Sequence, residues 1–165
     1  MKIAIIYFSE SGNTEKAAKY IAEGAESTGN TEVRLFNIKN NDLDKAYIES
    51  CGAVFFGTPT YCGNMCWQMK KWIDTDFSIR FADKLGAAFS TENNPVGGGA
   101  ELAIMTLHNH LLVKGMLVYS SGTAYGKPYI HIGPALPKDE IDQYKDICVL
   151  FGQRVANKAK ELFEK

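Results

Sequence analysis

Short apolar runs alternate along this chain with longer segments in which apolar and charged residues recur at helical spacing. The apolar runs predict strands at Lys2–Phe8, Glu32–Asn37, Ala53–Gly57, Leu85–Ser90 and Met116–Ser121. The longer segments predict helices at Asn13–Thr28, Leu43–Glu49, Met65–Asp74, Ala100–Lys114 and Lys138–Phe163. The first run is almost continuously apolar, which is typical of a parallel strand that is buried on both faces.

Strict alternation of strands and helices predicts an α/β fold, a doubly wound parallel sheet with helices on both faces. The chain has 165 residues and contains no linker, repeat or low-complexity tract. We therefore expect a single domain over residues 1–165.

The turn after the first strand is the most informative segment. It consists of Ser9, Glu10, Ser11, Gly12, Asn13 and Thr14, and it opens directly into the first helix. The free N–H groups and the positive dipole end of that helix point back into the turn, which favours an anion and most of all a phosphate. An alternative interpretation is an ordinary capped helix start, because Ser and Thr are common caps.

The kind of phosphate can be narrowed from the same turn. It contains no Lys or Arg, and it matches neither the G-x-x-x-x-G-K-[ST] loop of nucleotide triphosphatases nor the dinucleotide pattern G-x-G-x-x-G. Hydroxyls and backbone N–H groups instead suit a single terminal monophosphate held by hydrogen bonds.

Composition excludes several other classes. Hydrophobic residues at 45% and charged residues at 22% are ordinary for a globular protein. No apolar run is long enough to span a membrane, and the N-terminus lacks a signal-peptide pattern, so we expect a cytoplasmic protein without disulfides between its four cysteines. A formal net charge of −1 predicts no nucleic-acid partner.

The sequence then resembles a known family. The flavodoxin signature is matched in order by Ile5, Ile6, Tyr7, Ser9, Gly12, Thr14, Ala18 and Ile21. The segments Phe55–Asp74 and Lys84–Glu101 resemble the flavin loops of WrbA-type NAD(P)H:quinone oxidoreductases and of NADPH-dependent FMN reductase relatives. The resemblance implies a flavodoxin-like sheet of order 2-1-3-4-5, with FMN where the first and third strands diverge. Flavodoxin is itself a standard example of that rule.

The second loop of the implied FMN site consists of Pro59, Thr60, Tyr61, Cys62, Gly63 and Asn64. Pro59 fixes one backbone angle, and Gly63 allows a close approach to a flat ring. Tyr61 could stack on that ring or be a half-exposed surface residue. The resemblance implies backbone N–H contacts to the flavin O4 and N5 edge, although WrbA relatives place Arg-Phe where this chain has Tyr61-Cys62.

The third loop supplies Ser90, Thr91, Glu92, Asn93, Gly97 and Gly98, which the resemblance places at the pyrimidine end of the flavin. A mobile surface loop is the alternative. The glycine-rich form resembles the enzymes of the family, in which substrate approaches an uncovered flavin face.

Other chemically notable residues have structural interpretations. Cys62 and Cys66 are expected to be buried small hydrophobes rather than a ligand or redox pair, because metal sites need three or four ligands. His108 and His110 should face different ways on a helix, so we expect no metal site. For Trp67 and Trp72 we favour positions in the core.

The last third of the chain departs from the WrbA pattern. A family His-His pair is replaced by Val113 and Lys114, and the segment 120–140 is expected to lead directly to the last helix, with 122–126 resembling the end of a longer family connection. Because that connection is short here, we expect a homodimer formed through apolar helix faces, with a higher oligomer still possible.

The resemblance implies that the chemistry belongs to the flavin, so we expect no catalytic side chain. We favour an FMN-dependent oxidoreductase that passes electrons from NAD(P)H, through flavin N5, to a quinone or another small acceptor. The alternative is a flavodoxin-type electron carrier that acts with redox protein partners, and a flavin-binding regulatory protein is a third option. The near-neutral charge favours the enzyme, since such carriers are usually strongly acidic.

Overall fold

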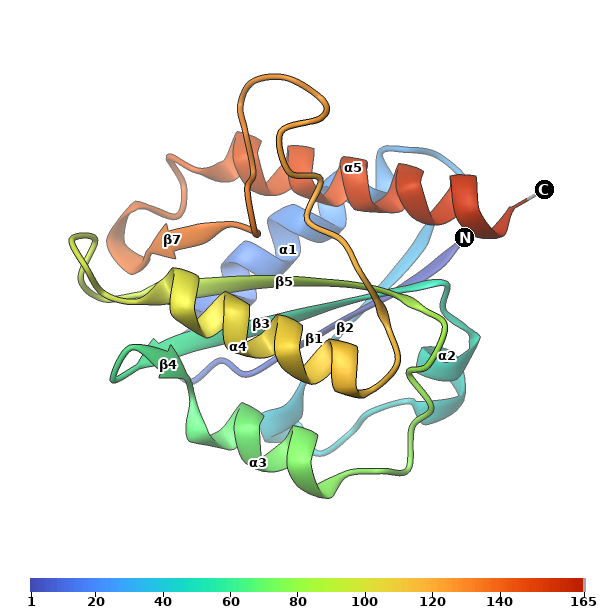
Figure 1. The fold of residues 1–165 in the computed structure, drawn as a ribbon, viewed down its shortest axis with the longest axis horizontal. Helices are drawn as coiled ribbons and strands as arrows, with labels where there is room; N and C mark the ends of the chain where they lie inside the picture. The colour runs from blue at the N-terminus through green and yellow to red at the C-terminus, as the bar shows by residue number, and fades with distance from the viewer. Residues whose placement is uncertain (165) are drawn as a thin grey trace.

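A parallel sheet forms the centre of the computed structural model, which describes residues 1–164 and leaves Lys165, the end of the expected domain, outside (Figure 1). Its main strands are β1 (Lys2–Tyr7), β2 (Glu32–Asn37), β3 (Ala53–Tyr61), β5 (Leu85–Glu92) and β6 (Leu117–Val118). They lie in the order β2-β1-β3-β5-β6, and every neighbouring pair is parallel. The predicted order 2-1-3-4-5 is thus confirmed.

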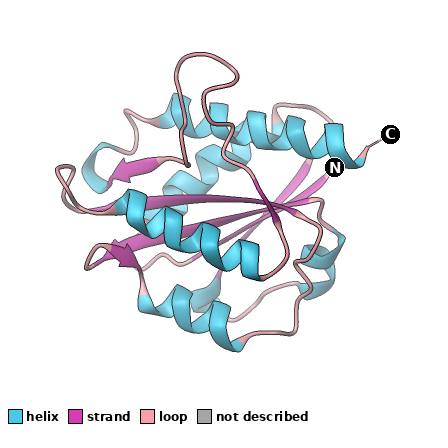
Figure 2. Cartoon of the chain, viewed as in Figure 1, coloured by secondary structure: helices cyan, strands magenta, loops and turns pink. Residues whose placement is uncertain are grey.

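Helices cover both faces of this sheet (Figure 2). One face carries α1 (Asn13–Glu26) and α5 (Lys145–Phe163), and the other carries α2 (Lys45–Ser50), α3 (Trp67–Thr75) and α4 (Ala100–Val113). Alternate residues of β1 enter the two cores: Ile3 and Ile5 pack on the α1 side, Ala4 and Ile6 on the other. The doubly wound α/β class is therefore confirmed, and none of the described helices is both long and apolar enough to cross a membrane.

Strand β3 runs past its predicted end at Gly57 and forms a hairpin with β4 (Asn64–Met65). The two turn residues, Cys62 and Gly63, have φ angles of 51° and 72°, as a two-residue type I′ hairpin requires. Because Met65 pairs with Thr60, the helix predicted to begin at Met65 begins two residues later. Residues 59–64, which the sequence analysis expects to form a loop, therefore extend the sheet as a hairpin.

The predicted fifth strand, Met116–Ser121, is wrong in its second half. Only Leu117–Val118 pairs with the start of β5, and β7 (Ala135–Pro137) later pairs in parallel with its end. Ser121 and Gly122 have φ angles of 68° and 53°, which turn the chain out of the strand. The two short strands thus share one edge of β5.

The connection to the last helix is likewise not direct. After β7 the chain forms the 3-10 helix η2 (Lys138–Glu140), and α5 begins only at Lys145, not at Lys138. The segment 119–134 packs on α5, where the guanidinium of Arg154 donates to the carbonyl oxygens of Pro128 at 3.1 Å and Tyr125 at 3.2 Å. The segment is therefore a fixed part of the α5 face.

Helices α1 and α5 approach until their backbones touch. A Cβ added at Gly152 would lie 2.1 Å from the carbonyl oxygen of Ile21, and one added at Gly24 would lie 1.9 Å from that of Val149. Real Cβ atoms do not come so close, so only glycine allows this crossing. The crossing fixes the position of α1.

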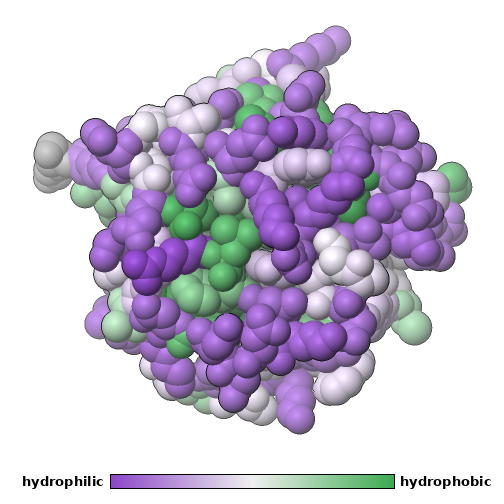
Figure 3. Space-filling view, turned by 180° about the vertical axis from the view of Figure 1, so that it is seen from behind, coloured by the Kyte–Doolittle hydropathy of each residue, from purple (hydrophilic) through white to green (hydrophobic). Residues whose placement is uncertain are grey.

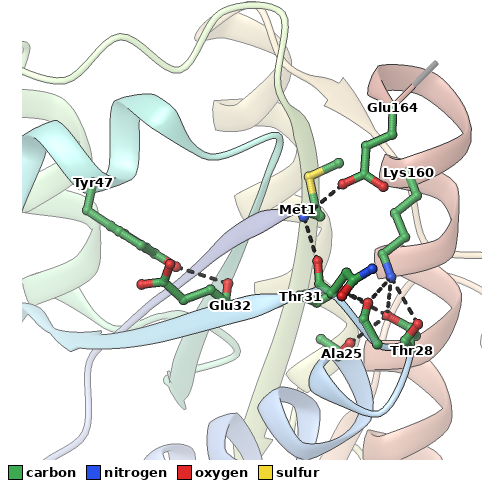
Figure 4. A network of polar contacts seen from close by, with 10 residues as sticks. Met1, Ala25, Thr28, Thr31, Glu32, Tyr47, Lys160 and Glu164 are labelled. Atoms are coloured by element: carbon green, nitrogen blue, oxygen red, sulfur yellow. Dashed lines mark hydrogen bonds and ion pairs between the residues drawn. The ribbon is translucent and has the colours of Figure 1, made fainter.

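Polar contacts tie the ends of these elements together (Figure 4). The amine of Lys160 on α5 donates to the carbonyl oxygen of Thr28 at 3.0 Å, to its hydroxyl at 2.9 Å, and to the carbonyl oxygen of Gly29. The N-terminal amine of Met1 lies 2.7 Å from a carboxylate oxygen of Glu164. The C-terminal end of α1, the start of β1 and the end of α5 are thus joined.

Two expectations about single residues are wrong. Cys62 is exposed because it lies in the hairpin turn, whereas Cys66 is buried as expected. Trp67 begins α3 with its side chain outward and is 62% exposed, whereas Trp72 is partly buried against Phe81. The face seen from behind is mainly hydrophilic, with a main apolar area near its centre and smaller apolar areas elsewhere (Figure 3).

We predict that Gly152→Ala lowers the free energy of unfolding by about 2 kcal/mol or more, since overpacking at a rigid contact typically costs about 1–3 kcal/mol. Urea unfolding followed by circular dichroism measures the change. Asn157→Ala is the control, because Asn157 is exposed on the same helix, and it should change stability by less than about 0.5 kcal/mol. A variant Gly152→Ala as stable as the wild type would show that the crossing adjusts freely.

A second prediction concerns acid stability. His108 is 7% exposed, its Nε2 has no hydrogen-bond partner among residues 1–164, and burial lowers its pKa below the ordinary value. Above about pH 6.5 the imidazole is neutral in both the folded and the unfolded state, so it has no effect on the pH dependence. Below that pH the unfolded chain binds a proton that the folded protein does not bind, and stability falls by up to about 1.4 kcal/mol per pH unit.

His108→Leu should therefore reduce the loss of stability between pH 7 and pH 5, measured by urea unfolding at each pH. The exposed His131 provides the control, and His131→Gln should leave the pH slope unchanged. Equal slopes in His108→Leu and the wild type would contradict the prediction.

Candidate functional site

The loops that follow β1, β3 and β5 surround a cavity of about 190 Å³ at the carboxyl edge of the sheet. It is lined by Ser9, Glu10, Ser11, Asn13, Thr14, Pro59, Thr60, Tyr61, Thr91, Glu92, Asn93 and Lys138. All of these except Lys138 are residues that the sequence analysis selected. The structure therefore brings the three loops together at the switch between β1 and β3, where ligands of such sheets bind.

The first loop holds a side-chain cap for α1 and three backbone donors that no protein group accepts. The hydroxyl of Ser9 accepts the N–H groups of Gly12 at 3.1 Å and Glu15 at 3.3 Å, so Ser9 caps α1. Within residues 1–164, however, the N–H groups of Ser11, Asn13 and Thr14 donate to no protein acceptor. These three donors lie at the positive end of α1 and remain available to an anion.

Asn37, the last residue of β2, holds the first loop in place. Its side-chain amide donates to the carbonyl oxygen of Ser9 at 3.0 Å, and its oxygen accepts the Ser9 N–H at 3.3 Å. At the rim, the Lys39 amine pairs with the Glu10 carboxylate at 3.0 Å. The start of the loop is thus fixed by a neighbouring strand.

A buried pair of hydroxyls joins the first loop to the third. Thr14 Oγ1 lies 2.9 Å from Thr91 Oγ1, and the two residues are only 2% and 3% exposed. Either hydroxyl can donate to the other. Only one hydrogen is used in this bond, so the pair keeps a second hydrogen that can be donated into the cavity.

Similar contacts join the second loop to the third. The Ser90 hydroxyl donates to the carbonyl oxygen of Thr58 at 2.8 Å and lies 2.9 Å from the hydroxyl of Thr60. Ser90 is fully buried and does not line the cavity. Its place is therefore structural, holding β3 and β5 in register where the cavity opens.

Glu92, at the end of β5, presents a buried carboxylate beside the cavity. One oxygen accepts the backbone N–H of Ala100 at 3.0 Å, which caps α4 and places negative charge at the positive end of that helix. A Cβ at Gly98 would lie 2.3 Å from the same oxygen, so Gly98 makes room for the carboxylate. Gly98 of the glycine-rich segment thus packs directly against the Glu92 carboxylate.

The sequence analysis missed Lys138, the cation that lines this cavity. It follows β7 in η2, and within the described residues its amine has no ion-pair partner. The sequence analysis assigned this residue to the start of the last helix because β7 was not recognised. No local sequence pattern marks it, because the role of the preceding segment Ala135–Pro137 shows only in its pairing with the end of β5, next to the cavity.

Seven selected residues do not line the cavity: Gly12, Cys62, Gly63, Asn64, Ser90, Gly97 and Gly98. Cys62 and Asn64 line a second groove on the outer side of the hairpin, and Tyr61 borders both spaces. The hairpin itself is held against α4, because a Cβ at Gly99 would lie 2.7 Å from the Cα of Gly63.

Burial favours the neutral form of two titratable groups at the hairpin. Burial raises the pKa of the Tyr61 hydroxyl and that of the Cys66 thiol, and the thiol also accepts a contact from the Thr58 hydroxyl at 3.4 Å. Neither group is thus activated as a nucleophile. Within residues 1–164, no group of three or more His, Cys, Asp or Glu side chains is placed to hold a metal ion.

The sequence profile of the family described as "Flavodoxin" matches residues 5–97. The chain is also 45% identical to "Flavodoxin" of Clostridium saccharobutylicum, over 99% of this chain and 100% of that protein. This chain belongs to the flavodoxin family. Family membership confirms the fold that the sequence predicted.

Two further relatives of this flavodoxin-family protein are a quinone dehydrogenase and a flavodoxin of known structure. It is 31% identical to "NAD(P)H dehydrogenase (quinone)" of Geotalea uraniireducens, over 86% of this chain and 78% of that protein. Its structure matches that of "a flavodoxin from the domain Archaea" with a TM-score of 0.78 and 25% identity, over 97% of this chain and 99% of that one. Both branches expected from the sequence are thus present among its relatives, with the flavodoxin at the higher identity and coverage.

Proposed function

We propose that this protein is an FMN-binding electron carrier that exchanges electrons with redox protein partners. The full-length match to a flavodoxin at 45% identity carries the proposal. The sequence analysis preferred an NAD(P)H oxidoreductase and kept the carrier as its alternative. The alternative is the better supported of the two, since the quinone dehydrogenase match is lower in identity and covers less of both chains.

The near-neutral net charge was used to favour the enzyme, beside the glycine-rich third loop, and it is weak support. Net charge governs long-range steering toward a partner and the salt dependence of that encounter. It carries no information on whether one or two electrons are exchanged. A formal net charge of −1 is therefore compatible with a carrier whose partners are not recognised by charge.

The residues of the first loop fit the phosphate of FMN. The unpaired N–H groups of Ser11, Asn13 and Thr14 and the second hydrogen of the Thr14–Thr91 pair are donors on one side of the cavity. Lys138 adds a positive charge to a loop that has none of its own. Charge-assisted hydrogen bonds to a phosphate are the strong kind, so this end should supply much of the affinity.

The second and third loops fit the flat ring. Pro59 and Tyr61 border one part of the cavity, and Thr91, Glu92 and Asn93 border another. The cavity of about 190 Å³ is small next to the roughly 300–1,000 Å³ of sites that enclose a ligand, so part of the ring would stay uncovered. Bound FMN supplies the electron chemistry, and an uncovered edge suits exchange with a partner protein.

A second candidate function rests on the 31% identity to a quinone dehydrogenase. In that case FMN would take electrons from NAD(P)H and pass them to a quinone or another small acceptor, without a protein partner. The expected homodimer belongs to the same candidate, because it was inferred by comparison with those enzymes.

We predict that Thr14→Val weakens FMN binding, because the phosphate loses a donor and the Thr91 hydroxyl loses its partner. A hydrogen bond to a charged group is worth about 1.5–3 kcal/mol, so the Kd should rise roughly ten- to hundredfold. Thr14→Ser keeps the hydroxyl and is the matched control. Riboflavin, which lacks the phosphate, should bind weakly and nearly equally to all three proteins, as measured by quenching of flavin fluorescence. Equal FMN affinity in Thr14→Val and the wild type would show that Thr14 serves only the start of α1 and not the phosphate.

Carrier and enzyme are separated by a redox test of the FMN-loaded protein. A carrier should be reduced by dithionite in two resolved one-electron steps and should react slowly with free NADH or NADPH in stopped flow. The enzyme should be reduced quickly by one nicotinamide in a single two-electron step and reoxidised by a small quinone. That second pattern would overturn the proposal.

A further inference from the structure

A second groove, of about 470 Å³, lies on the outer side of the β3–β4 hairpin. It is lined by Tyr61, Cys62, Asn64, Met65, Trp67, Lys70 and Thr106, and so runs between the hairpin, the start of α3 and the outer side of α4. These elements lie side by side at the front of Figure 1. The groove is separate from the cavity but shares Tyr61 with it.

The outer side of α4 extends this groove with apolar side chains. Leu102 and Met105 are 63% and 43% exposed, and Met105 and Thr106 lie three and four residues after Leu102, so both neighbour Leu102 on the helix surface. With Trp67, which is 62% exposed, they form an exposed apolar surface that we call the α4 patch. A helix in a folded protein normally turns such a stripe to the core, so its exposure points to a partner.

The groove is almost free of charge, and the α4 patch is bordered by one exposed carboxylate, that of Glu101. Lys70 is the one ionisable amine or carboxylate along the groove within the described residues, and it is already paired with Asp74, one turn further along α3. A surface of this kind cannot steer a partner by Coulomb attraction. It would bind through burial of apolar area, which salt does not screen.

The size of the α4 patch distinguishes between possible occupants. The exposed parts of Trp67, Leu102, Met105 and Tyr61 add up to roughly 300–500 Å², given that a large side chain presents about 150–250 Å². A stable dimer buries about 800 Å² on each partner, whereas weak electron-transfer encounters bury less than about 1,200 Å² in total. The patch therefore fits a transient partner better than a second copy of this chain.

We infer that the α4 patch is the docking surface for the redox partner, and that this partner presents an uncharged, apolar contact surface. The inference rests on the proposed function as an electron carrier. Docking here would place the partner beside Tyr61, which borders both the groove and the cavity, and so next to the uncovered edge of bound FMN. Recognition then depends on shape and apolar contact rather than on an acidic surface.

The test measures electron transfer from a purified NADPH-dependent reductase of one-electron carrier proteins to the FMN-loaded protein. The wild-type second-order rate constant should change by less than about twofold between about 0.05 M and 0.5 M NaCl. Leu102→Lys should lower it at least about tenfold at both salt concentrations, as expected for a central apolar contact. Leu162→Lys is the matched control, because Leu162 is 44% exposed near the end of α5, on the opposite face of the sheet, and its rate should equal that of the wild type.

Two further measurements separate the explanations. FMN affinity and reoxidation of the reduced protein by ferricyanide should be the same in all three proteins, which would show that the flavin site is intact. A rate that is unchanged in Leu102→Lys, or that falls steeply with salt in the wild type, would overturn the inference while leaving the carrier function in place.

A wild-type dimer in sedimentation that Leu102→Lys dissociates would make the patch a self-interface instead. Wild-type protein that binds FMN but takes no electron from the reductase would refute the carrier function, and with it the docking inference.

Discussion

The backbone contact between α1 and α5 is the constraint on which the candidate site depends. Gly24 and Gly152 let the two helices touch, and the touching backbones leave α1 little freedom to slide or rotate. The N-terminus of α1 is also one wall of the cavity, so the N–H groups of Asn13 and Thr14 are positioned by a contact made several turns away. A site that binds an anion through backbone donors needs this rigidity, because those donors cannot move independently of their helix.

The three loops of the site are also joined to one another. Hydrogen bonds join Thr14 to Thr91, Thr60 to Ser90, and Asn37 to Ser9. Each loop therefore shares at least one polar contact with a neighbouring strand or loop. Such a network resists rearrangement when a ligand binds or leaves, since breaking one contact leaves a buried polar group without a partner. These contacts therefore fix the positions of the three loops relative to one another.

Much of this could be predicted from the sequence, and the failures have a common cause. Buried parallel strands and amphipathic helices have strong local patterns, so most elements were found from the sequence, whereas the strand order and much of the cavity lining came from the resemblance to the flavodoxin family. The hairpin after Gly57 and the divided fifth strand were missed, because each depends on pairing with a distant segment: Met65 with Thr60, and Leu136 with Thr91. Lys138 was missed for the same reason, and no local pattern marks a residue that reaches a site through another strand. The prediction that Trp67 lies in the core was wrong, because it rested on residue type alone, and tryptophan is on average a highly buried residue type.

The last strand is divided into β6 and β7, and this division separates the loop between them from the residues that line the cavity. Strands β6 and β7 are both anchored on β5, so the segment 119–134 leaves the sheet and returns to the same edge. A loop with both ends held in this way adds little closure entropy when it lengthens. Ile130 and Gly133 pack against the core and the sheet, but residues 123–129 are exposed and have no such packing constraint. Lys138 and the cavity lie beyond the return point, fixed by β7. The outer surface of this protein can therefore tolerate change at 123–129 while the geometry of the cavity stays the same.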